Sequence, residues 1–117
     1  MKVKTTDPGF KEWLAACQKK VDEYMEHSGY APLQKTKLRV AKGSRRYIKV
    51  TALRLIQNTE GEYKVNGESA WAFIDTTNGD ILKPASWKAP AKHSRGNLFD
   101  SNKGLGMVGP QGPAYLR

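Results

Sequence analysis

The chain is poor in cysteine, in acidic residues and in long apolar runs. Its one cysteine, Cys17, excludes an internal disulfide and a cysteine-based metal cluster within one chain, so a reducing cytosol is the natural setting. No run of 18 apolar residues exists, and residues 1–7 lack the apolar core of a secretory signal. We therefore expect a cytoplasmic protein with no membrane-spanning segment.

Catalytic groups are also scarce. The two histidines, His27 and His93, have no recognisable zinc spacing, and the sequence places no carboxylate beside His93 to orient it. Residues 104–109 match G-x-G-x-x-G, but prolines follow where a dinucleotide site needs a helix. Cys17 falls on an apolar stripe, which favours a buried, inert thiol. We expect no enzyme, no metal and no cofactor.

Positive charge is what the chain has in excess. It carries 20 Lys and Arg against 11 Asp and Glu, a net charge of +9. From Ser28 to Ile56 there is no acid and there are eight basic residues: Lys35, Lys37, Arg39, Lys42, Arg45, Arg46, Lys49 and Arg54. A second basic stretch covers residues 87–96. Such a charge points to nucleic acid, an anionic surface or an acidic protein as the partner.

Residues 7–28 predict one amphipathic helix. Asp7 suits the N-cap, Pro8 the first helical position and Gly29 the position that ends a helix. Apolar residues recur at steps of three and four, as on one helix face. This stripe comprises Phe10, Trp13, Leu14, Cys17, Val21, Tyr24 and Met25.

Residues 36–83 predict an antiparallel meander. In residues 45–56 one face would carry Ile48 and Val50 and the other Tyr47 and Lys49, with a bulge or bend near residues 52–53. Residues 69–75 read as a central strand, and residues 78–79 as a hairpin turn. The Gly- and Pro-rich residues 84–117 have no clear period yet are too apolar for a free tail.

The expected architecture is therefore a single α+β domain. The helix and a roughly four-stranded antiparallel sheet would occupy residues 1–83, with the helix across one sheet face. Residues 84–117 would form a basic, irregular segment docked on that same domain.

The basic stretches and their aromatic neighbours predict a nucleic-acid surface. Cations would contact phosphates without reading sequence, and rings would stack on bases. The cations are Lys35, Lys37, Arg39, Arg45, Arg46, Lys49, Lys88, Lys92 and Arg95, and the rings are Tyr47 and Trp87. The alternative is a basic face that only keeps strand edges soluble, with Trp87 packed for structural reasons.

A third aromatic pair lies in residues 69–75. The sequence Trp71-Ala-Phe73-Ile resembles the centre of the strand signature of the RNA-recognition motif, in which aromatic residues two apart stack on bases. Trp71 and Phe73 would then share a face. The flanking Lys/Arg-Gly, the final aromatic residue and that fold's second helix are absent here, so a core position for both rings is the favoured alternative.

The C-terminal part resembles small uncharacterised proteins encoded by tailed bacteriophages. The resemblance spans about residues 71–117 and is carried by Thr77-Asn-Gly-Asp80, by residues 87–97 (WKAPAKHSRGN) and by residues 112–117 (GPAYLR). It implies a phage product acting in the infected bacterial cytoplasm or in a virion. That family has no assigned activity, so no functional residue is transferred.

Three functions follow from these patterns. The leading hypothesis is a small non-enzymatic nucleic-acid-binding protein, with DNA and RNA both open as partners. The alternative is a phage protein-interaction module that inhibits an acidic host protein or forms a minor virion component. The third, a small enzyme that uses His93, has no substrate that the sequence can name.

Overall fold

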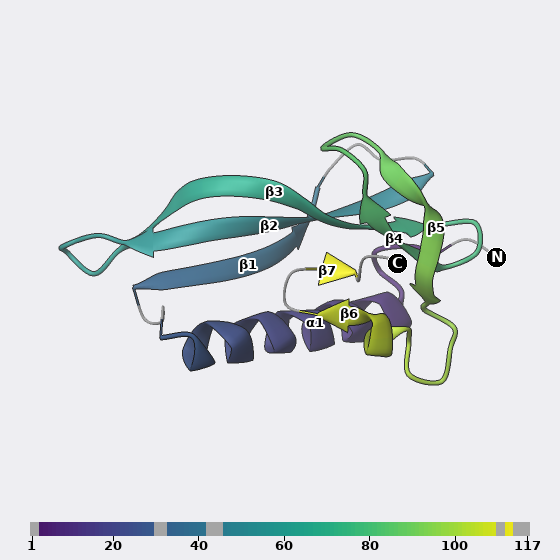
Figure 1. The fold of residues 1–117 in the computed structure, drawn as a ribbon, viewed down its shortest axis with the longest axis horizontal. Helices are drawn as coiled ribbons and strands as arrows, with labels where there is room; N and C mark the ends of the chain where they lie inside the picture. Colours follow the sequence, from purple (N-terminus) through teal and green to yellow (C-terminus); the bar gives the residue numbers. More distant parts are fainter. Residues whose placement is uncertain (1–2, 30–32, 42–45, 110–111, 114–117) are drawn as a thin grey trace.

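One α-helix among the described residues packs on an antiparallel sheet (Figure 1). The computed structural model describes residues 3–29, 33–41, 46–109 and 112–113. In chain order the elements are α1 (Pro8–His27), β1 (Gln34–Val40), β2 (Tyr47–Gln57), β3 (Tyr63–Asp75), β4 (Asp80–Pro84), β5 (Pro90–Asn97), the short 3₁₀ helix η1 (Leu105–Met107), β6 (Val108–Gly109) and β7 (Gly112–Pro113). Strands β1–β5 form one sheet in chain order, and β6 pairs with β7. The predicted α+β architecture is confirmed, with five strands in the main sheet.

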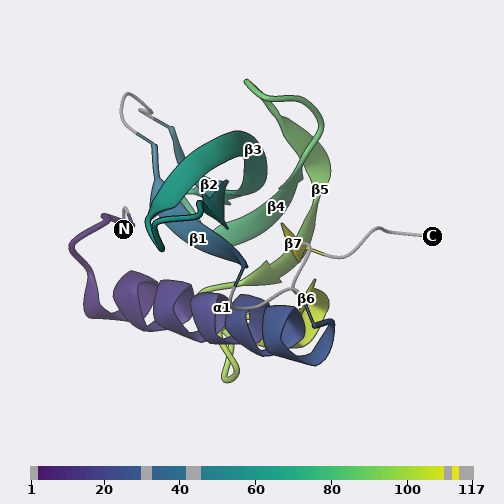
Figure 2. The same cartoon turned by 90° about the vertical axis from the view of Figure 1, so that its left-hand side faces the viewer.

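Helix α1 lies across one face of the sheet (Figure 2). Pro8 occupies its first turn, and Gly29 follows it with a φ of +80°. Phe10, Trp13 and Val21 are buried in the core as the period predicts, whereas Tyr24 at the same spacing is 42% exposed. In the described ranges, no helix combines the length and apolarity needed to cross a membrane.

Strand β2 sets the two faces of the sheet. Ile48 and Val50 point into the core beneath α1 and define the inner face. Tyr47 and Lys49 alternate with them and define the outer face. Strand β1 pairs with β2 without a register shift, so its basic residues share this outer face. They are Lys35 opposite Leu55, Lys37 opposite Leu53, and Arg39 opposite Thr51.

Two irregularities interrupt the pairing of β2 with β3. Val50 pairs with Ala72 and Thr51 with Ala70, so Trp71 is the extra residue of a bulge in β3. Its ring packs on Trp13 of the core, whereas Phe73 pairs with Lys49 on the outer face. The prediction that Trp71 and Phe73 share a face is wrong, because a bulge shifts the alternation by one residue.

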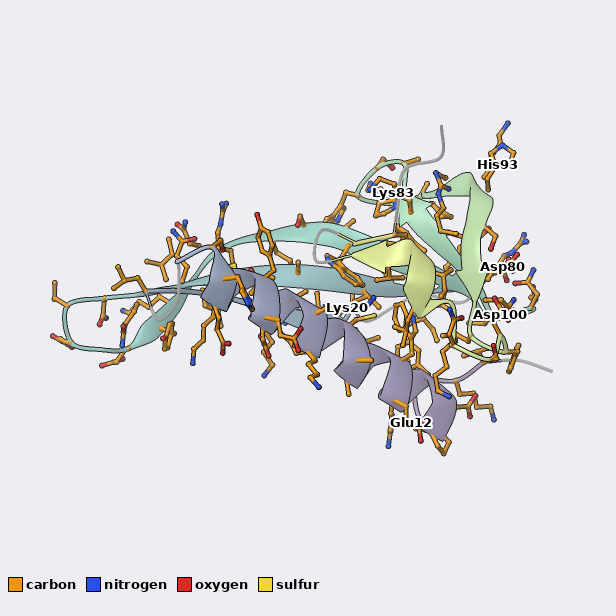
Figure 3. All side chains as sticks on the ribbon, turned by 60° about the horizontal axis from the view of Figure 1, so that its bottom comes forward. Glu12, Lys20, Asp80, Lys83, His93 and Asp100 are labelled. Carbon is orange, nitrogen blue, oxygen red and sulfur yellow. The ribbon has the colours of Figure 1, made fainter. Side chains whose placement is uncertain are left out.

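Residues 84–109 and 112–113 contain more regular structure than their composition indicated. Strand β5 pairs with β4, and residues beyond it fold back onto the inner side of the domain. Lys20 of α1 donates from Nζ to the carbonyls of Leu105 and Val108, both at 2.8 Å, and Lys83 donates to a carbonyl in β7 (Figure 3). A Cβ at Gly112 would lie 2.7 Å from the Trp71 carbonyl oxygen. The described part of this segment thus packs against α1 and the sheet.

Gln18 covers the free edge of β1. Its Nε2 donates to the Thr36 carbonyl and its Oε1 accepts from the Leu38 amide, each at 2.8 Å. The side-chain amide thus replaces the peptide group of a neighbouring strand. An uncovered strand edge is a template for pairing with another chain.

We expect Gln18→Ala to promote self-association through this edge. The variant loses two part-buried hydrogen bonds, which should lower the free energy of unfolding by about 1–3 kcal/mol. Light scattering coupled to size exclusion measures the association, with Lys19→Ala on the exposed side of α1 as the control. A Gln18→Ala protein that stays monomeric at high concentration would contradict the assignment.

Cys17 behaves as a core residue. It has no exposed surface, and its burial raises the pKa of its thiol to about 12. We expect a thiol-specific reagent such as dithionitrobenzoate to leave the native protein unlabelled at neutral pH and to label it stoichiometrically in denaturant. Rapid labelling of the folded protein, checked by circular dichroism, would contradict this packing.

Candidate functional site

The outer face of the sheet gathers aromatic rings and cations in one place. Helix α1 and strands β6 and β7 lie on the inner side, and the loop between β4 and β5 reaches across the outer side (Figures 1 and 2). Through that loop, Trp87 meets Lys49. We call Tyr47, Lys49, Phe73 and Trp87, with the adjacent Arg46 and Lys88, the cation–ring surface.

Lys49 lies at the centre of this surface. Its Nζ is 3.3 Å from the centroid of the Trp87 ring and 6.0 Å from that of Phe73. Burial lowers the pKa of Lys49 and nearby Lys88 lowers it further, while Glu68 opposes both effects. The ammonium is thus held against aromatic carbon beside a second cation, an environment that an incoming anion would improve.

Arg46 is fixed over the neighbouring ring. Its guanidinium carbon lies 5.2 Å from the centroid of Tyr47, and Nη2 is 3.2 Å from Oδ2 of Asp75. Burial alone would raise the pKa of Asp75, but hydrogen bonds from Thr77 and from Arg46 outweigh it, so this pKa lies below its ordinary value. The carboxylate therefore stays ionised and orients Arg46, at the cost of neutralising much of its charge.

The β1 end of the outer face is more neutral than its sequence indicates. Arg39 forms an ion pair with Glu68 at 3.1 Å, and Thr51 donates to the same carboxylate at 2.6 Å. The Thr51 hydrogen bond and then the Arg39 pair hold the pKa of Glu68 below its ordinary value. Lys35 lies 4.4 Å from the centroid of the Tyr63 ring. At this end of the outer face, Glu68 thus compensates part of the positive charge.

A groove joins the two basic stretches of the sequence. It has a volume of about 440 Å³ and lies between the start of β2 and β5. Arg46 and Tyr47 line one side, and Lys92 lines another. The remaining lining comes from Asp75, Asn78, Asp80, Leu82, Pro90 and Ala91. The fold therefore places Lys92 within reach of any ligand that Arg46 contacts.

One predicted phosphate contact, Arg95, is not supported by the geometry, and another, Arg45, is untested. Arg95 is 7% exposed and its guanidinium donates to the His93 carbonyl, so it serves the local fold of β5 and we correct its assignment. Arg45 lies outside the described residues. Lys37, Lys88 and Lys92 are exposed as predicted.

Several partners in the site could not be found by the sequence analysis. Asp75 and Glu68 lie far along the chain from Arg46 and Arg39. The pairing of β2 with β3 brings Asp75 to Arg46, and the pairings of β1 with β2 and of β2 with β3 bring Glu68 to Arg39. A correct register for β2 and β3 would have paired Tyr47 with Asp75 and so indicated that Asp75 lies near Arg46. Phe73, favoured as a core residue, is buried but on the outer face.

Histidine catalysis gains no support from the geometry. His93 is exposed on β5 and points outward, away from Asp80 and Asp100 (Figure 3). Among the described residues, no group of three or more His, Cys, Asp or Glu side chains could hold a metal ion. The cation–ring surface and its groove are therefore the candidate functional site.

Comparisons with known proteins give a family and no activity. No curated protein matches the chain. No solved structure matches it either. A family model matches residues 10–110, from the first turn of α1 to beyond β6, and its description is a family of unknown function, DUF7717. The match covers most of the 117 residues, and the chain belongs to this family.

Proposed function

We propose that the protein binds nucleic acid through the outer face of its sheet and does no chemistry. The observation that carries the proposal is the set of four cation–ring contacts among the described residues, all on that face. A polyphosphate chain with stackable bases offers a counterpart to both groups. The bacteriophage origin and the action in an infected cytoplasm or a virion are part of the same proposal.

The cations would not contribute equally. Lys37, Lys88 and Lys92 are exposed and would contact phosphates directly. Arg46 and Arg39 already bind carboxylates, so a phosphate would compete with Asp75 and Glu68 for them. Affinity would therefore come from the lysines, with little dependence on sequence because phosphate contacts read no bases.

A salt series tests the proposal. Fluorescence anisotropy with labelled single-stranded DNA, duplex DNA and RNA should show binding that weakens steeply as salt rises. The logarithm of the association constant falls by about 0.7 per phosphate contact on a single strand for each tenfold rise in salt. A weak signal that is equal for all three ligands and absent near physiological salt would refute nucleic acid as the partner.

An acidic protein is the second candidate, and one observation favours it. On the half of the outer face beyond Thr51, Leu53 and Leu55 stand opposite Lys37 and Lys35, and Val65 nearby is 62% exposed. Aliphatic side chains beside lysines suit a protein surface better than a phosphate chain. A pull-down from nuclease-treated bacterial lysate would test it, since a stoichiometric partner that Lys35→Glu releases supports this alternative.

A further inference from the structure

We infer that the ligand is a single-stranded nucleic acid, with one base stacked on Trp87 and Lys49 moving from that ring to a phosphate. The inference rests on the proposed function and narrows its ligand class. DNA and RNA single strands share the required chemistry, a phosphodiester chain with unstacked bases.

Trp87 is presented by an ordered turn. In the loop between β4 and β5, the amides of Ala85 and Ser86 donate to the Ala89 carbonyl at 3.0 and 3.1 Å. The Ser86 hydroxyl accepts from the amides of Lys88 and Ala89. Trp87 therefore projects from a closed loop, and a ring fixed before binding loses little entropy when a base arrives.

Among the rings of the outer face, Trp87 offers the most surface to a base. It is 47% exposed, whereas Phe73 is 3% exposed beneath Tyr47 and Lys49. Tyr47 is half-buried, with Arg46 over its ring and an edge-to-face contact with Phe73. The Lys49 ammonium occupies one face of Trp87, so a base would stack on the opposite face.

A duplex cannot use this ring. Its bases are stacked on one another and present only their edges in the grooves, so a projecting indole would meet sugars and phosphates. A single strand exposes base faces, and stacking tolerates any sequence because every base has a π-face. The exposed Trp87 beside exposed Lys88 thus fits a single strand better than a duplex.

Lys49 is placed to change partners as the strand binds. Its Nζ is held by the Trp87 ring next to Lys88, and its pKa is lowered by burial and by that second cation. A phosphate beside the stacked base would be a stronger partner than the ring, since a charge-assisted hydrogen bond replaces a cation–ring contact. Base and phosphate would therefore bind together at Lys49 and Trp87.

The test compares strands with and without bases. The ligands are an oligothymidylate, a uridine RNA, an abasic oligodeoxynucleotide of the same length and a duplex. Trp87→Ala should bind the base-bearing strands about tenfold more weakly, the loss of one stacked base, and bind the abasic strand as the wild type does. Phe99→Ala, which removes a 64% exposed ring outside the cation–ring surface, is the matched control.

Lys49→Met separates the two halves of the contact. It keeps an apolar stem under the ring but removes the charge, so the salt slope should fall by about 0.7 for base-bearing and abasic strands alike. Tryptophan fluorescence supplies an independent signal, because Trp13 and Trp71 are buried and Trp87 is exposed. Base-bearing strands should quench the wild type and leave the emission of Trp87→Ala unchanged.

The outcomes separate this inference from the proposed function. If the abasic strand and the duplex bind as tightly as the oligothymidylate, or if Trp87→Ala weakens none of them, the inference is overturned while phosphate binding stands. If no ligand binds the wild type at low salt, the proposed function fails, and the inference with it. Selective loss of base-bearing strands in Trp87→Ala establishes the single-stranded ligand.

Discussion

The triple variant Lys37→Glu, Lys88→Glu and Lys92→Glu is expected to bind single-stranded oligonucleotide about 100-fold more weakly than the wild type. Three phosphate contacts become repulsive, and the salt slope should fall by about 2 because each contact on a single strand contributes about 0.7. All three side chains are exposed and outside the ion pairs of the surface, so the fold should persist. Anisotropy across a salt series measures both quantities.

A second triple variant controls for net charge. Lys4→Glu, Lys11→Glu and Lys19→Glu change the charge of the protein by the same amount, but these lysines are exposed at α1 and in the segment before it. This control should keep most of the affinity. Equal losses in the two triple variants would mean that charge acts generally and that the outer face is no binding site. Arg46 is left intact because reversing it would unpair buried Asp75.

Trp13→Ala is expected to have the largest effect on stability, a loss of about 3–5 kcal/mol in the free energy of unfolding. The ring has no exposed surface and contacts Phe10 at 6.0 Å and Trp71 at 6.2 Å between centroids. Truncation opens a cavity between α1 and the bulge of β3. Because small domains have only about 5–15 kcal/mol in total, urea unfolding should show a large shift of the midpoint.

Two further variants show whether that loss comes from packing. Trp13→Phe keeps a ring and removes an indole Nε1–H that has no hydrogen-bond partner among the described residues, so its cost should be much smaller. Trp87→Ala removes a half-exposed ring of the same type and should leave the midpoint nearly unchanged. A Trp13→Ala protein as stable as the wild type would show that the helix is not held by this contact.

Helix α1 and most of the sheet follow from the sequence because each depends on a local period. Steps of three and four predict α1, and the alternation in β2 correctly separates Ile48 and Val50 from Tyr47 and Lys49. The bulge near residues 52–53 was expected in the right region, and the first register shift lies between Val50 and Thr51. The extra residue of this bulge is Trp71 on the partner strand β3. The alternation of apolar residues within one strand does not show on which strand a bulge falls.

Most of the remaining misses depend on partners that are distant in the sequence. Strand β5 carries Pro90, Gly96 and mostly small or polar residues, so its propensity indicates a loop, and pairing with β4 overrides it. The sequence likewise overstated how much positive charge the outer face has free for a ligand. Arg39 and Arg46 form ion pairs with carboxylates from β3, and the Arg95 guanidinium donates to the nearby His93 carbonyl.

The anchoring of the C-terminal segment by Lys20 has a consequence for synthesis of the chain. Lys20 donates to the Val108 carbonyl across 88 residues, and Val108 itself is a core residue. On a ribosome, α1 emerges early, whereas Leu105 and Val108, whose carbonyls Lys20 binds, are translated 85 and 88 residues later. The core is thus expected to close only after Val108 has left the ribosome, and until then α1 can present part of its apolar stripe to chaperones.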